Sequence, residues 1–238
     1  MVDEDDTSNE YAIEVINNER DARLCAQLTA EEFIGHNPTT FFDKLTSDIL
    51  FHQRAWPLLA DVVDEQLSFL ARHQPSGEIV GTAIAGDLFL AHIKHPYDTD
   101  SSAHFLAIGD LCHEMNHLFI SRDFGQELKP NSVLNIIATA VRGEHSGQGL
   151  ASRMTRILCD HARKAKGFQY AFVQATHPAA RHIYRNKMGG RQVSLIDPTI
   201  WRWKKKFDRL SYPYKDYQDD LIENILIKLI LDEKSNKL

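Results

Sequence analysis

A strand, a glycine-containing turn and a helix follow one another directly near the middle of the chain, and this unit constrains the fold most. Residues 132–141 (SVLNIIATAV) are almost entirely apolar, which is typical of a strand buried on both faces of a sheet. Residues 150–166 carry apolar side chains at helical spacing, with arginines and lysines on the other faces. Such a unit predicts an α/β structure in which the turn lies at the end of a buried strand.

The rest of the chain alternates between the two periods of secondary structure. Strands are expected at residues 11–16, 66–73, 78–90, 168–176, 191–196 and 199–207. Helices are expected at residues 21–34, at 39–64 with a break near Pro57, at 101–122 and at 178–187. This order predicts a mixed α/β (α+β) domain built around one central sheet that is flanked by helices.

Three segments are expected from changes in composition. Residues 1–10 form an acidic tail, residues 11–207 form the domain, and residues 208–238 form an extension. Residues 219–232 carry an apolar stripe at helical spacing, so we expect an amphipathic helix there. This helix would dock on its own domain or mediate a homodimer.

Composition excludes several classes of function. The 27 Lys and Arg and 33 Asp and Glu give a net charge of −6, which argues against broad nucleic-acid binding. The basic run at residues 202–206 is interpreted as a solvated edge strand. No segment approaches the roughly 18 apolar residues of a membrane span, and residues 1–10 have no apolar core of a signal peptide. The three cysteines are far apart, which indicates free thiols and a cytoplasmic protein.

The turn at residues 146–152 is a candidate anion site. Backbone N–H groups at the start of a helix have no partner within the helix and attract negative groups. Gly147 and Gly149 would let the backbone approach such a ligand closely. The pattern is neither a Walker loop nor the dinucleotide fingerprint. An ordinary strand-to-helix turn with two glycines is the alternative.

The residues Ser146-Gly147-Gln148-Gly149-Leu150-Ala151 resemble the acyl-CoA pyrophosphate loop of the GCN5-related N-acetyltransferase (GNAT) superfamily, [QR]-x-x-G-x-[GA]. Ser146 departs from the first position of that pattern. Residues 179–189 (AARHIYRNKMG) resemble the family's A-x-x-x-Y-x-x-x-G helix, with one additional residue before the glycine. The helix at 101–122 and the Gly-His-Asn-Pro segment at 35–38 are similar to the invertebrate arylalkylamine N-acetyltransferases.

The resemblance implies a mostly antiparallel sheet with a splayed parallel strand pair at the CoA site. It also implies acetyl-CoA as co-substrate and Tyr184 as the group that protonates the departing CoA sulfur. A phenol with a pKa near 10 is protonated at pH 7 and can donate. The residues assigned to CoA binding are Thr139, Ala140, Val141, Ser146, Gly147, Gln148, Gly149, Leu150, Ala151, Ser152 and Tyr184.

The expected catalytic base is missing. The insect enzymes end their first helix in Glu-Pro, and that glutamate deprotonates the amine; the matching position here is Asn37. The vertebrate melatonin-pathway enzyme uses a His-x-His pair, which corresponds to Asn135 and Ile137. His36 is the nearest replacement, with an ordinary imidazole pKa near 6.5. The alternatives are that the enzyme captures the neutral fraction of the amine, or that its substrate is not an arylalkylamine.

The resulting function is transfer of acetyl from acetyl-CoA to a small arylalkylamine by direct attack. A GNAT-fold module that binds acyl-CoA without catalysis and a peptide or protein N-acetyltransferase are the alternatives. His113 and His117 have the i, i+4 spacing of zinc ligands, yet nothing in the sequence completes a site, so we expect no metal.

Overall fold

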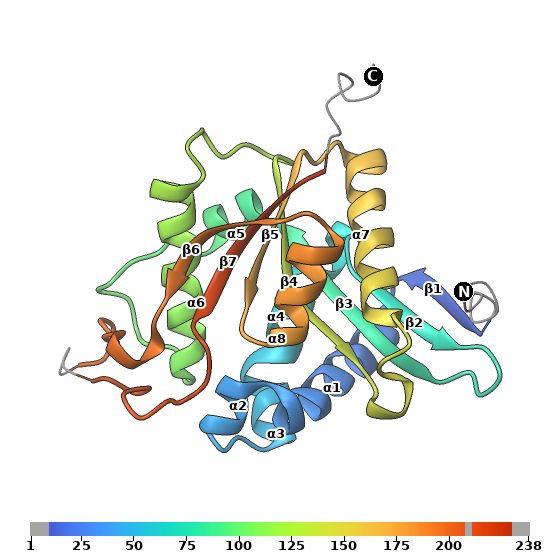
Figure 1. Ribbon diagram of the computed structural model, residues 1–238, viewed down its shortest axis with the longest axis horizontal. Coiled ribbons are helices and arrows are strands. Elements are labelled where there is room, and N and C mark those ends of the chain that lie inside the picture. The colour runs from blue at the N-terminus through green and yellow to red at the C-terminus, as the bar shows by residue number, and fades with distance from the viewer. Residues whose placement is uncertain (1–9, 208–210, 230–238) are drawn as a thin grey trace.

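A seven-stranded mixed sheet forms the centre of the molecule, in the order β1-β2-β3-β4-β5-β7-β6 (Figure 1). The computed structural model describes residues 10–207 and 211–229. The strands are β1 (Tyr11–Val15), β2 (Phe69–His73), β3 (Ile79–Asp87), β4 (Val133–Val141), β5 (Tyr170–Ala175), β6 (Arg191–Ile196) and β7 (Ile222–Lys228). Within this sheet β4 and β5 are parallel, and the other neighbouring pairs are antiparallel. The mostly antiparallel sheet with a parallel pair is therefore confirmed.

The parallel pair separates along its length. Residues 133–136 of β4 pair with residues 170–173 of β5, and beyond Ile136 β4 pairs only with β3. The pairing skips Ile137, because Ile84 faces Ala138 and Ala85 faces Ile136. Such a bulge increases the local twist of a strand. The side of β4 that faces β5 is consequently left without a strand partner over residues 137–141.

Helices cover both faces of the sheet (Figure 1). They are α1 (Glu19–His36), α2 (Pro38–Phe42), α3 (Ser47–Leu50), α4 (Trp56–Val62), α5 (Leu88–Lys94), α6 (Ala107–Leu118), α7 (Leu150–Lys166) and α8 (Pro178–Arg181). π-helical turns continue three segments at Phe51–Ala55, Phe119–Asp123 and His182–Lys187. Asn18 is the N-cap of α1, and its side chain accepts a hydrogen bond from the Asp21 N–H.

Two hydrophobic cores lie on opposite faces of the sheet. Met154, Leu158 and Ala162 of α7 pack on one face, where they join residues of β2 to β5. On the other face α1, α4 and α6 pack together, with Ala22, Leu59 and Leu111 among their buried side chains. This arrangement holds β4 between the two cores, and the mostly exposed turn before α7 follows the end of this strand.

Two helix and strand expectations in the body of the chain are wrong. The segment 39–64 breaks after α2, at residues 43–46, and not near Pro57. Pro57 lies in the first turn of α4, where its missing N–H and fixed φ are tolerated. Residues 199–207 form no strand, because a 3-10 turn at Pro198–Ile200 is followed by bends that bury Trp201 and Trp203.

The amphipathic helix expected at residues 219–232 is also wrong. Residues 222–228 form β7, which lies between β5 and β6. A strand with partners at both edges and cores on both faces carries apolar residues on both of its sides, so its sequence does not alternate. Its apolar run fits a helical stripe equally well. The homodimer contact expected from this helix loses its basis, and residues 230–238 lie outside the described residues, as do residues 1–9 of the acidic tail.

No helix in the described part of the chain is long and apolar enough to cross a lipid bilayer.

Candidate functional site

A cleft of about 1070 Å³ opens where β4 and β5 separate. Its lining includes the unpaired side of β4, the turn before α7 and the helical segment that carries Tyr184. The same cavity continues past the strands to side chains of α1, α4, α5 and α6. One continuous space therefore joins a region with the predicted cofactor residues to a region that the sequence did not single out.

The turn before α7 has the backbone conformation that its glycines allow. Gly147 and Gly149 have φ values of +78° and +76°, in the left-handed region that side chains with a Cβ disfavour. Gly149 is the N-cap of α7 and offers no side chain to the first N–H groups of that helix. These amides remain available to an anion, which is the arrangement expected of a phosphate site.

The structure brings most of the predicted cofactor residues to one place. Thr139, Ala140, Val141, Ser146, Gly147, Ala151 and Tyr184 line the cleft. Gln148, Gly149, Leu150 and Ser152 belong to the same turn but are not part of that lining. The side chains of Leu150 and Ser152 are buried, so these residues can offer a ligand their backbone but not their side chains.

The turn is anchored by residues that the sequence did not reveal. The buried Tyr11 hydroxyl donates to Oε1 of Gln148 at 2.9 Å and lies 2.9 Å from Nδ1 of His145. Arg142 forms ion pairs with Glu31 at 2.5 Å and with Glu32 at 3.6 Å. The turn is thereby fastened to β1 on one side and to α1 on the other.

Tyr184 is buried, and its hydroxyl lies 3.0 Å from Oγ1 of Thr139 on β4. Burial raises the pKa of Tyr184 to about 12, although hydrogen bonds from Thr139 and Thr155 act in the opposite direction. The phenol is therefore fully protonated at neutral pH. It can donate a hydrogen bond to a group that becomes negative beside β4.

Asn37 has a structural role that uses all of its polar atoms. Its Oδ1 accepts hydrogen bonds from the Thr39 hydroxyl at 2.7 Å and the Thr40 N–H at 3.3 Å, which caps α2. Its Nδ2 donates to the Thr176 hydroxyl at 2.9 Å, at the end of β5. A carboxamide held in this way fixes α1 to the opening between the strands and cannot accept a proton.

His36 lines the cleft beside Asn37, but its imidazole is largely exposed to solvent. Its Nδ1 lies 3.1 Å from the Glu32 carbonyl oxygen. His177 lies across the opening, where its Nδ1 accepts from the Ala179 N–H at 3.1 Å. Burial and the neighbouring His36 and Arg181 lower the pKa of His177, so it is neutral at pH 7.

Seven of the twelve histidines line this one cleft, and of these only His113 and His117 are grouped by their spacing in the sequence. They are His36, His92, His95, His104, His113, His117 and His177. They come from five separate segments of the chain, which only the fold brings together.

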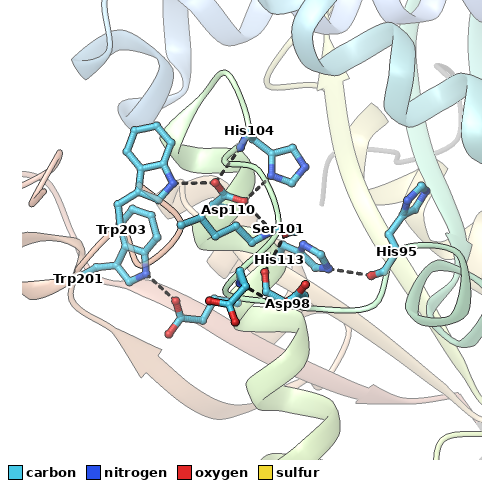
Figure 2. A network of polar contacts seen from close by, with 11 residues as sticks. His95, Asp98, Ser101, His104, Asp110, His113, Trp201 and Trp203 are labelled. Carbon is cyan, nitrogen blue, oxygen red and sulfur yellow. Dashed lines mark hydrogen bonds and ion pairs between the residues drawn. The ribbon is translucent and has the colours of Figure 1, made fainter. Parts of the chain in front are cut away.

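Two of these histidines, the half-exposed His104 and the partly buried His113, belong to a polar network around the buried Asp110 at the start of α6 (Figure 2). Asp110 accepts hydrogen bonds from Nδ1 of His104 at 2.5 Å and from the Trp203 indole at 2.6 Å, and it pairs with the Lys205 ammonium at 3.1 Å. Burial raises the pKa of Asp110, but these partners lower it well below the ordinary range. Asp110 is thus a carboxylate under all physiological conditions.

The second imidazole of this network is His113, one turn further along α6. Its Nε2 donates to the His95 carbonyl oxygen at 2.8 Å. Burial lowers the pKa of His113, so its ring is neutral at pH 7. One atom each of His104, Asp110 and His113 lie within 4.8 Å of one another, a spacing compatible with metal binding. The Lys205 ammonium already neutralises Asp110, however, so a further cation would be repelled.

A sequence profile described as the acetyltransferase (GNAT) family matches residues 25–189. The match covers more than half of the chain. The chain belongs to the GNAT family. It is accordingly an N-acetyltransferase of that family, as its resemblance indicated. A comparison with curated proteins gives no match for this GNAT protein.

Solved structures share the fold of this GNAT protein at low sequence identity. The C-terminal condensation domain of Ebony, solved with beta-alanyl-dopamine, is 16% identical with a TM-score of 0.69, covering 91% of this chain and 99% of that chain. A putative arylalkylamine N-acetyltransferase 7 of the yellow fever mosquito Aedes aegypti is 15% identical with a TM-score of 0.68, covering 92% and 88%. An agmatine N-acetyltransferase is 14% identical with a TM-score of 0.67, covering 92% and 100%.

Proposed function

We propose that this GNAT protein transfers the acetyl group of acetyl-CoA to the primary amine of a small arylalkylamine. The observation that carries the proposal is the continuous cleft that joins the unpaired side of β4, the turn before α7 and the protonated Tyr184 to a further region lined by α1, α4, α5 and α6. The likeness to arylalkylamine N-acetyltransferases supports the choice of amine.

In this proposal the cofactor lies along β4. The N–H groups at residues 147–152 hold the pyrophosphate, because the helix start and the glycine turn present unpaired amides to it. The pantetheine arm runs beside residues 139–141, where β4 has no strand partner toward β5. Backbone N–H groups of β4 then polarise the thioester carbonyl.

Tyr184 stabilises the departing thiolate. A thiol has a pKa of about 8.5, well below the value of about 12 for Tyr184. The phenol therefore donates a strong hydrogen bond to the sulfur but releases its proton only when another proton replaces it. The ammonium formed by the attacking nitrogen supplies such a proton.

The amine must reach the thioester in its neutral form. Asn37 cannot deprotonate it, since both polar atoms of its side chain are engaged in hydrogen bonds. His36 is close to the opening and remains the candidate at that position, although its imidazole is largely exposed to solvent and its Nδ1 lies beside the Glu32 carbonyl oxygen. Capture of the neutral amine fraction is the route that needs no base.

An assay of thiol release from acetyl-CoA tests the function directly. The panel contains arylalkylamines, diamines and short peptides, and the thermal shift caused by acetyl-CoA is measured in parallel. We expect a thermal shift and turnover with at least one arylalkylamine. A shift without any turnover would support a CoA-binding module, whereas faster turnover of peptides would replace the proposed acceptor class. The three free cysteines suit a reducing compartment, and we propose the cytoplasm.

A further inference from the structure

The cleft contains a second polar region, at the start of α6, that the transfer chemistry above does not use. Its members are His104, His113 and Lys205, which line the cleft, and Asp110 behind them. α6 also contacts the opening between the strands, because the Gln174 side chain donates to the Cys112 carbonyl at 2.9 Å and to Asn116 Oδ1 at 2.8 Å. This polar region therefore begins about one helical turn from the opening.

We propose that His104 and His113 form an acceptor subsite that selects an amine with a neutral hydroxyl at its far end and rejects an amine with a second positive charge. The proposal rests on the acetyltransferase function above and names the chemistry of its acceptor. It assigns these two residues to specificity and not to the transfer step.

Hydrogen bonding fixes which nitrogen of each ring is free. A neutral imidazole has one donor and one acceptor nitrogen. Nδ1 of His104 donates to Asp110, so Nε2 is the nitrogen of this ring that is left for a ligand. Nε2 of His113 donates to a backbone carbonyl, so its acceptor lone pair lies on Nδ1. No described residue hydrogen-bonds either of these nitrogens, so both are open to a ligand that replaces solvent there.

The charge around the subsite excludes a cationic donor. Asp110 is neutralised by the buried ammonium of Lys205, which itself faces the cleft. Among the described residues that line the cleft, the two acidic ones are Glu32 and Asp61. Glu32 pairs with Arg142, and Asp61 pairs with Lys94 at 3.3 Å. A guanidinium or second ammonium of an acceptor would therefore meet Lys205 without an unpaired carboxylate to bind.

A neutral hydroxyl can donate a hydrogen bond to the imidazoles, and it also avoids a positive charge beside Lys205. Figure 2 shows how the two rings are held, with Asp110 lying between Trp203 on one side and the imidazoles on the other. The rings are 6.1 Å apart between centroids and nearly perpendicular, so they approach a ligand from different directions.

Three amines test the subsite. Phenethylamine lacks a hydroxyl, tyramine adds one at the far end, and putrescine carries a second ammonium. We expect kcat/KM to be about tenfold higher for tyramine than for phenethylamine, as one buried hydrogen bond provides. Putrescine should be slower than both. Equal values for tyramine and phenethylamine, or a faster reaction with putrescine, would overturn the proposal.

The residues are tested through the ratio of the two aromatic substrates. His104→Phe and His113→Phe should each reduce the preference for tyramine to less than threefold while the reaction of phenethylamine changes little. His52→Phe is the matched control, because His52 lies on the surface beside Asp48 and outside the cleft lining. A variant that slows both aromatic substrates equally would indicate a structural role and would contradict the assignment.

Direct binding separates this inference from the proposed function. Calorimetric titration of tyramine and phenethylamine into the wild-type protein saturated with CoA measures the subsite without any transfer. Tighter binding of tyramine with no turnover would leave the subsite standing and the transfer function refuted. Turnover of both amines with equal binding would support the transfer function and refute the subsite. 5-Aminovalerate is included because Arg54 also lines the cleft, and preferred binding of this carboxylate would overturn the choice of a hydroxyl.

Discussion

The proposed cofactor side and the proposed acceptor side of the cleft are built by different physical means. On the cofactor side, backbone geometry does most of the work: an unpaired strand, two glycines with positive φ and the start of α7. On the acceptor side, the surface consists of side chains from distant segments, held by a buried charge pair between Asp110 and Lys205. Backbone sites leave a short local pattern in a sequence, whereas side-chain networks of this kind leave none.

The largest effect is expected from breaking the charge pair on the acceptor side. Asp110→Asn leaves the Lys205 ammonium buried without a counter-charge, which should lower the free energy of unfolding by about 3–5 kcal/mol. Urea denaturation measures this change. The exposed pair of Glu127 with Lys129 offers the control, since Glu127→Gln should alter stability by less than about 1 kcal/mol. A loss for Asp110→Asn no larger than that of the control would show that the network is not what holds this side together.

The next effect concerns the cofactor side and its chemistry. Tyr184→Phe removes the hydroxyl that faces Thr139, so kcat should fall about 100-fold if thiolate stabilisation limits the rate. The affinity for acetyl-CoA should stay within about twofold, because the ring that packs in the core is retained. Tyr170→Phe, on the neighbouring strand, is the control. Full turnover of Tyr184→Phe under conditions in which chemistry is rate-limiting would remove Tyr184 from the mechanism.

A smaller effect should follow from changing the backbone of the turn. Gly149→Val places a β-branched residue at a φ of +76°, which costs about 1–2 kcal/mol in the left-handed region. We expect acetyl-CoA affinity to fall about tenfold by titration, because the turn must shift away from its anion-binding geometry. Gly35→Ala in α1, where open space surrounds the added methyl group, should leave affinity unchanged. Unchanged affinity in Gly149→Val would mean that the cofactor side does not depend on this backbone.

The smallest effect is a dependence of stability on pH. The pKa of His113 is lowered in the folded protein, mainly by burial, so the unfolded chain takes up its proton first as the pH falls below about 6.5. The unfolded state then binds more protons, and the free energy of unfolding decreases until the folded pKa is passed. Melting temperatures between pH 7.5 and pH 5 should therefore decline, and they should decline less in His113→Phe. His177 also has a lowered pKa, but it is present in both the wild-type protein and His113→Phe and so contributes equally to both curves. Parallel curves for the two proteins would therefore contradict a contribution of His113.

The side of the cleft that is built from backbone could be predicted from the sequence, whereas the side that is built from distant side chains could not. α7 begins and ends at the predicted residues, since an amphipathic face and a C-terminal glycine define it locally. β4 was located from its own apolar run, and Tyr184 was assigned from the resemblance of residues 179–189 to the family's helix. The acceptor subsite could not be predicted, because Asp110, Lys205 and Trp203 meet only after the chain has folded. β7 was mistaken for a helix because its neighbours, and not its own residues, determine that it is a strand.

The position of β7 has a consequence for synthesis of the chain. β5 and β6 precede β7 in the chain, so until residues 222–228 have been made β5 is paired only with β4, and β6 has no strand partner. Until then the edge of β5 away from β4 presents a row of unpaired amide and carbonyl groups, and an open strand edge can recruit other chains. The sheet is therefore complete only after β7 has been made, and a chain that is cut off before residue 222 would expose strand edges and be prone to aggregation.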